Sequence, residues 1–167
     1  MEQTIPALII AAVMIAAGIL LADVTTKSVS NSNESFRQIE AIAEDRLGTD
    51  LSITNTAVAG GGTEVTFDVL NEGRTPMDDF DNMDLIITYD GTDANRYVVW
   101  LPFNEDVSQP DNTWQITSFL NDYHYIGVLE MGEQMSVRIK LNPATDVGPD
   151  RWFVLATETG LSYTVYY

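Results

Sequence analysis

The sequence predicts an α+β protein in which a long hydrophobic N-terminal helix precedes an all-β, immunoglobulin-like antiparallel sandwich. Two observations carry this prediction. Residues 5–22 contain no charged side chain, and after Gly48 the apolar residues change from a helical period to alternation with polar ones. We therefore expect two parts, a helix over residues 1–48 and a β-sandwich head over residues 49–167.

The uncharged segment at residues 5–22 is long enough to cross a membrane. Its 18 residues would span about 27 Å as a helix, close to the hydrocarbon thickness of a bilayer. Pro6 fits the first helical turn, where a backbone N–H is not needed. A signal peptide is disfavoured, because such peptides begin with basic residues and the first basic residue here is Lys27.

Small residues within this segment indicate that the helix packs against other helices. They recur four positions apart, which places the members of each pair on one side of a helix and lets two backbones approach closely. The pairs are Ala7 with Ala11, Ala12 with Ala16, and Gly18 with Ala22. The alternative is that alanine is present only as a good helix former.

The helix is predicted to continue past the uncharged segment and to stop at Gly48. Apolar residues with spacings near three to four and seven mark a second contact stripe. They are Val24, Val29, Phe36, Ile39, Ala43 and Leu47. The weakest stretch is SVSNSNES at residues 28–35, because serine and asparagine side chains compete for backbone hydrogen bonds. One expectation is a bend or break there, and the alternative is a continuous helix that makes residues 5–47 a rod of about 65 Å.

Short strands are predicted throughout the part that follows Gly48. Apolar and polar side chains alternate most clearly at residues 64–71 and 135–141. Further candidates are residues 50–59, 85–90, 96–103, 114–120, 125–131, 151–158 and 161–167. Turn residues separate these segments at near-regular intervals, a pattern typical of a β-sandwich.

Charge and composition exclude several classes of function. The net charge is −17, and 19 acidic and five basic residues follow Gly48, so the net charge of that part is −14. Such a surface repels nucleic acid and anionic membrane surfaces, and we predict no nucleic-acid partner. The chain has no cysteine, which excludes disulfides and thiolate metal sites. A salty habitat and an acidic filament exterior both account for the charge.

Acidic residues that could hold a hard cation gather at residues 77–84 and 89–95. The first group contains Asp78, Asp79, Asp81 and Asp84, and the second contains Asp90, Asp93 and Asn95. Calcium prefers several such oxygens, but their spacing is not that of an EF-hand loop. We therefore predict a solvated acidic loop and no metal site, with a calcium site as the alternative.

Other candidate sites carry a weaker signal. His124 is the one histidine, and Ser118 or Ser136 could be proposed as its nucleophile, but no nucleophile-elbow motif is present. We therefore predict no enzymatic activity and no cofactor. Asn33 begins the one N-x-S/T sequon and is a candidate glycosylation site.

A mostly uncharged N-terminal helix followed by an all-β head resembles the archaellins and related archaeal-type members of the type IV pilin superfamily. The segments that carry the resemblance are IPALIIAAVMIAAGILLADV, VTFDVLNEGRTPM, LIITYDG and LEMGEQMSVRIKLNP. Bacterial type IV pilins carry a glutamate near the start of the apolar helix, where this chain has Ile5. This difference favours the archaellin-like branch.

The resemblance implies a subunit that is inserted in the membrane with a short leader, trimmed by a dedicated leader peptidase, and assembled by dedicated machinery into a helical bundle. It also implies that the chain starting at Met1 is the trimmed form. The expected function is a structural subunit of an extracellular filament, for motility or adhesion, that polymerises with copies of itself. The alternative is a membrane-anchored β-sandwich accessory protein that stays in the envelope.

Overall fold

The computed structural model describes residues 4–106, 108–122, 124–146, 148 and 150–167. Within its helix, side chains are described at Met14, Gly18, Val24 and Thr25 and from Lys27 onward. The chain forms two compact units, Met1–Ala43 and Glu44–Tyr167, and each is considered by itself. The last turn of the helix therefore belongs to the unit that contains the strands.

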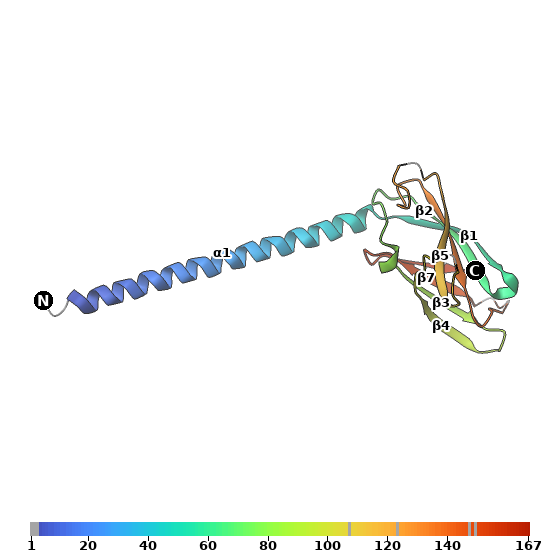
Figure 1. Ribbon diagram of the computed structural model, residues 1–167, viewed down its shortest axis with the longest axis horizontal. Coiled ribbons are helices and arrows are strands. Elements are labelled where there is room, and N and C mark those ends of the chain that lie inside the picture. Colours follow the sequence, from blue (N-terminus) through green and yellow to red (C-terminus); the bar gives the residue numbers. More distant parts are fainter. Residues whose placement is uncertain (1–3, 107, 123, 147, 149) are drawn as a thin grey trace. The chain divides into compact units, whose positions relative to one another are not determined.

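Helix α1 runs from Thr4 to Gly48 (Figure 1). The expectation of a break at residues 28–35 is wrong, because the helix continues through them. The hydroxyl of Ser32 donates to the carbonyl oxygen of Ser28 at 2.9 Å, and that of Ser35 donates to Asn31 at 3.0 Å. These hydroxyls bond carbonyls one turn back along the helix, so they do not displace its backbone hydrogen bonds.

Among the residues with described side chains, no helical stretch is both long enough and apolar enough to span a bilayer. The predicted span at residues 5–22 lies almost entirely outside those side chains. Membrane insertion of this segment stays a prediction.

The second unit contains two four-stranded antiparallel sheets, which confirms the predicted β-sandwich (Figure 1). Sheet I has the order β1-β2-β6-β5 and sheet II has the order β4-β3-β7-β8. In chain order these correspond to the ABED and C′CFG sheets of an immunoglobulin-like domain. The strands are β1 (Leu51–Ala59), β2 (Glu64–Asn71), β3 (Asp84–Asp90), β4 (Arg96–Leu101), β5 (Thr113–Leu120), β6 (Gln134–Lys140), β7 (Trp152–Ala156) and β8 (Ser162–Tyr166). Two short 3₁₀ helices, η1 (Gly60–Gly62) and η2 (Phe80–Asn82), lie in the connections.

The core lies between the inner faces of the two sheets. Phe67 on β2 is 1% exposed and Phe153 on β7 is fully buried. Their rings stack with centroids 4.5 Å apart. Antibody domains join the corresponding two strands by a disulfide. In this cysteine-free chain, an aromatic pair connects the sheets instead.

The predicted strand at residues 125–131 is wrong, since the described part of this segment forms turns. Tyr125 and Ile126 are 68% and 90% exposed, whereas Leu129 is fully buried and forms a single bridge with Met77. Gly127 has a φ of 85°, a left-handed conformation that interrupts extended backbone. The apolar residues here therefore supply one buried anchor, Leu129, rather than a ladder of paired residues.

Candidate assembly surface

The apolar stripe predicted for the second half of α1 is exposed in the isolated chain. Val24 is 62% exposed, and Val29, Phe36 and Ile39 are 60%, 69% and 63% exposed. Ala43 is exposed as well. Val29, Phe36 and Ala43 lie seven residues apart, which keeps them within about 40° of one another on a straight α-helix. The unit that ends at Ala43 thus presents an apolar surface that its own described residues do not cover.

The small-residue positions in the first half of α1 are described only in part. The backbone is helical at all of them, and Gly18 is exposed with open space where a Cβ would be. The side chains of the other five, Ala7, Ala11, Ala12, Ala16 and Ala22, lie outside the described residues. Their role in helix packing stays a prediction.

The last turn of α1 is hydrogen-bonded to the β-rich unit to which it belongs. The carbonyl oxygen of Gly48 accepts from the backbone N–H groups of Arg74 at 2.7 Å and Thr75 at 3.2 Å. The Thr75 hydroxyl donates to the carbonyl oxygen of Asp45 at 3.1 Å. These bonds satisfy carbonyls that every helix leaves unpaired at its C-terminus. Leu47 in this turn is 85% exposed.

Asn71 holds the loop that receives this turn. It is fully buried, and its amide nitrogen donates to the carbonyl oxygens of Thr75 and Leu129, both at 2.9 Å. Its amide oxygen accepts from the backbone N–H of Gly73 at 3.0 Å. A Cβ at Gly73 would collide with the carbonyl oxygen of Gly48. The Asn-x-Gly segment that contributed to the family resemblance therefore has a structural role at the end of the helix.

The aspartates at residues 78–84 do not converge on a common point. Asp78, Asp79 and Asp81 are exposed. Asp79 accepts a 2.7 Å hydrogen bond from the side chain of Asn82, and Asp84 accepts one of 2.8 Å from the indole N–H of Trp100. Within the described ranges, no three histidine, aspartate or glutamate side chains are arranged to hold a metal ion.

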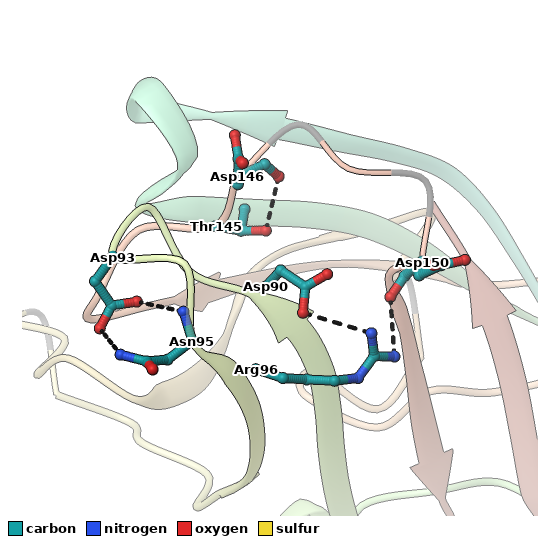
Figure 2. Close-up of polar contacts among 7 residues, drawn as sticks. All are labelled: Asp90, Asp93, Asn95, Arg96, Thr145, Asp146 and Asp150. Atoms are coloured by element: carbon teal, nitrogen blue, oxygen red, sulfur yellow. Dashed lines mark hydrogen bonds and ion pairs between the residues drawn. The ribbon is translucent and has the colours of Figure 1, made fainter.

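Figure 2 shows that the second acidic group is bonded within itself and to Arg96. Asp93 accepts hydrogen bonds from the backbone and side chain of Asn95, at 3.2 and 2.8 Å, and from the Tyr97 hydroxyl at 2.6 Å. The Tyr97 bond and the Asn95 side-chain bond lower the pKa of Asp93. Asp90 lies 3.4 Å from the Arg96 guanidinium. These oxygens organise the turn between β3 and β4.

Glu158, in the turn between β7 and β8, is the one acidic residue in the described part whose pKa is shifted upward. Burial raises the pKa of its carboxyl, and the negative charges of Asp79, Asp78 and Asp45 raise it further. Its buried Oε2 has no hydrogen-bond partner among the described residues. Sequence reasoning missed this residue, because its three acidic neighbours are distant in sequence.

The remaining candidates do not form a catalytic site. His124 lies in an exposed loop. The hydroxyl of Ser136 donates to Asp68 at 2.7 Å, and Ser118 is exposed on β5. Asn33 is exposed on α1, and its glycosylation stays a prediction. Sequence reasoning also missed Ile42, which is 53% exposed on α1.

A family model described as archaeal-type flagellin matches residues 4–167. The fold is similar to the archaellum periplasmic stator protein FlaG from Sulfolobus acidocaldarius, with 16% identity over 71% of this chain and 99% of that chain and a TM-score of 0.49. It is also similar to the archaellum periplasmic stator protein complex FlaF and FlaG from the same organism, with 16% identity over 70% and 87% and a TM-score of 0.48. No curated protein matches in sequence.

Proposed function

The chain belongs to the archaeal-type flagellin family, and from this premise we propose that it is a structural subunit of an extracellular helical filament that polymerises through α1. Proteins of this family are archaellum-related, are associated with the cell surface or envelope, and are not enzymes. The proposal adds that copies of this chain assemble with one another outside the cell. It also adds that the β-sandwich heads form the outside of that polymer.

The observation that supports polymerisation most directly is the exposed apolar stripe of α1. Helix α1 has 45 residues, which is about 68 Å at 1.5 Å per residue. A bilayer core of about 30 Å occupies only some 20 residues of a helix. A membrane anchor beginning near Ile5 has no use for Phe36 or Ile39, which are 69% and 63% exposed. Neighbouring helices would cover them in a polymer.

The first half of α1 would use the same surface in two environments. Before assembly the apolar side chains would face lipid, and after assembly they would face copies of the same helix. In both environments the backbone N–H and C=O groups are hydrogen-bonded within the helix. Small residues such as Ala12 and Ala16 would let helices approach closely, and dispersion summed over many contacts would supply cohesion. A repeated contact whose rotation does not close produces an open filament.

Mechanical shear of cells tests whether the chain is located in filaments or in the cell envelope. Cells that produce the full chain are sheared, and the sheared filaments and cell bodies are probed separately. We expect most of the chain in sheared filaments visible by negative-stain electron microscopy. Recovery of the chain only with the envelope would contradict the proposal and favour the accessory role.

Two variants on opposite faces of α1 test the stripe itself. Phe36→Asp places a charge in the proposed contact and should abolish filaments, because an unpaired buried carboxylate is costly. Gln38→Asp adds the same charge on the polar face and should leave filaments intact. A third, double variant tests the small-residue pairs: Ala12→Phe combined with Ala16→Phe should likewise prevent assembly by keeping helices apart. Equal filament yield from all of these variants would refute assembly through α1.

A further inference from the structure

The two sheets of the head differ in how their edges are protected. Both edge strands of sheet I carry a register shift, between Thr54 and Ala57 in β1 and between Ile116 and Ser118 in β5. Asn55 in the first shift has a φ of 54°. Bulges at edge strands disturb the row of backbone groups that another chain would need for pairing. Sheet I is therefore protected against edge-to-edge contact.

The edge strands of sheet II carry no register shift, although β1 lies beside the start of β8, where the Leu51 N–H donates to the Tyr163 hydroxyl at 3.2 Å. β4 pairs with β3, and β8 pairs with β7, residue by residue along their lengths. The sequence of β8, SYTVY, contains no charge and no proline, and the only charge in β4, RYVVWL, is Arg96 at its start. In the described part of the chain no strand pairs with the outer edge of either. Natural sheets seldom leave regular, uncharged edges open.

The outer face of sheet II is also apolar at these edges. Val98 and Trp100 on β4 are 69% and 57% exposed, and Tyr166 on β8 is 74% exposed. The outer face of sheet I instead presents polar groups such as Asp68, whose carboxylate accepts from Ser136 and from Asn55, at 2.7 and 2.8 Å. An antiparallel sheet with one solvated face normally shows the second kind of surface. Among its described residues, sheet I exposes one large apolar side chain on its outer face, Leu120 at 56%, so the edges of sheet II carry the larger group of such side chains.

Electrostatics indicates what can approach this surface. A partner rich in lysine and arginine would be drawn to the acidic remainder of a chain whose net charge is −17. Another copy of the chain is repelled by that remainder and meets least repulsion where charge is absent or paired. On sheet II, Asp90 is paired with Arg96, whereas the carboxylate of Asp84 keeps its charge and accepts a hydrogen bond from the neutral Trp100 indole. The edge strands β4 and β8 contain no acidic side chain, so a second copy can approach along these edges without direct contact between like charges.

The topology of sheet II provides a direct geometry for the contact. β4 and β8 run in opposite directions, because three antiparallel pairings separate them. A copy translated across the sheet would therefore bring its β4 antiparallel to β8 of its neighbour. One row of paired residues crosses the sheet from Val98 through Thr88 and Trp152 to Tyr166. Continuing this row without a shift places Tyr166 of one copy beside Val98 of the next.

We propose that heads associate in this way, with β8 of one copy pairing antiparallel with β4 of the next and extending sheet II from copy to copy. The contact joins two different edges, so it does not close on itself and is compatible with an open polymer. The proposal rests on the proposed function, in which α1 already holds the copies together. A head contact that is weak alone gains from this high effective concentration.

Cysteine pairs test this contact cleanly, since the chain has no cysteine of its own. Val98→Cys and Tyr166→Cys are combined in the full chain, and intact cells are treated with a mild oxidant or a short bismaleimide. We expect a ladder of dimers and higher multimers on a non-reducing gel. Either single variant should remain monomeric. The matched control is Thr54→Cys with Ser118→Cys, which end the corresponding row across sheet I, and it should give no ladder.

Each outcome decides between alternatives. The proposal would be overturned if the first pair gave no ladder or if the control pair gave an equal ladder. Dimers from a single variant would also overturn it, because they would indicate a symmetric face-to-face contact. If the chain with both Val98→Cys and Tyr166→Cys does not accumulate, Trp100→Cys combined with Thr164→Cys tests the adjacent row. Crosslinking intact cells reports the contact wherever the chain resides. A crosslinked ladder in the absence of sheared filaments would therefore contradict only the proposed filament function. Sheared filaments without a ladder would contradict only the proposed contact between heads.

Discussion

Phe67 in the head is 1% exposed, whereas Phe36 in α1 is 69% exposed. The first ring stacks on Phe153 within the same domain. The second has no comparable cover within the described part of its own unit. The head thus buries apolar surface by folding, and α1 needs something outside the chain to do so. A substitution in the head should therefore change folding stability, and one in α1 should change assembly.

The largest expected effect comes from the same substitution made in both regions. Phe67→Ala should lower the free energy of unfolding of the head by about 3–5 kcal/mol, because it leaves a cavity between the sheets. Phe36→Ala should leave that free energy unchanged. All three tryptophans, Trp100, Trp114 and Trp152, lie in the head, so tryptophan fluorescence of the full chain in detergent during denaturant unfolding reports the head alone. A comparable loss from both variants would abolish the distinction between the two regions.

A smaller effect is expected at the loop after β2 that receives the last turn of α1. Asn71→Ala removes the partners of two carbonyl oxygens and one N–H group in a buried site. The head should lose about 2–4 kcal/mol of stability, since unsatisfied buried groups carry their full desolvation cost. Asn82→Ala removes an exposed hydrogen bond to Asp79 and should cost less than about 0.5 kcal/mol. The same fluorescence measurement applies, and equal losses would show that burial at Asn71 is not decisive.

The strands show what the sequence could and could not predict. Residues 64–71 coincide with β2, because its buried and partly buried side chains alternate without interruption. Residues 125–131 are equally apolar but form turns with one buried anchor at Leu129. The hydrophobicity of a segment shows that its side chains tend to be buried. A segment becomes a strand only if it also has an adjacent strand to pair with. That partner is set by the whole topology.

The candidate sites show the same limit. The apolar stripe of α1 was predictable, because helical spacing alone determines which residues share a face. The role of Asn71 was not predictable. Two of the three partners of its side chain, Gly73 and Thr75, lie near it in sequence, but the third, Leu129, lies 58 residues away. The row from Val98 to Tyr166 depends on three successive strand pairings. Sequence periodicity gives the faces of such strands, while their registers come from tertiary packing.

The smallest expected effect concerns Glu158, which lies near the place where the chain passes from helix to head. Burial raises the pKa of Glu158, and the negative charges of Asp79, Asp78 and Asp45, the last in the final turn of α1, raise it further. Because its pKa is higher in the folded state, folding favours the protonated carboxyl. Glu158 imposes no cost below the unfolded pKa of about 4. Stability is lost as the pH rises through the folded pKa, above which the full cost applies.

Glu158→Gln removes this cost and should raise the melting temperature of the head at pH 7 by about 1–3 °C. This gain in melting temperature should shrink as the pH falls. It should vanish near pH 4, where the Glu158 carboxyl of the unsubstituted protein is protonated and therefore as neutral as the glutamine amide. Glu72→Gln, at an exposed glutamate in the loop after β2, removes the same charge and should change the melting temperature by less. A gain from Glu158→Gln that persisted unchanged at pH 4 would mean that packing of the amide, rather than relief of a buried charge, produces it. The pH dependence therefore shows whether the ionised carboxylate of Glu158 destabilises the head.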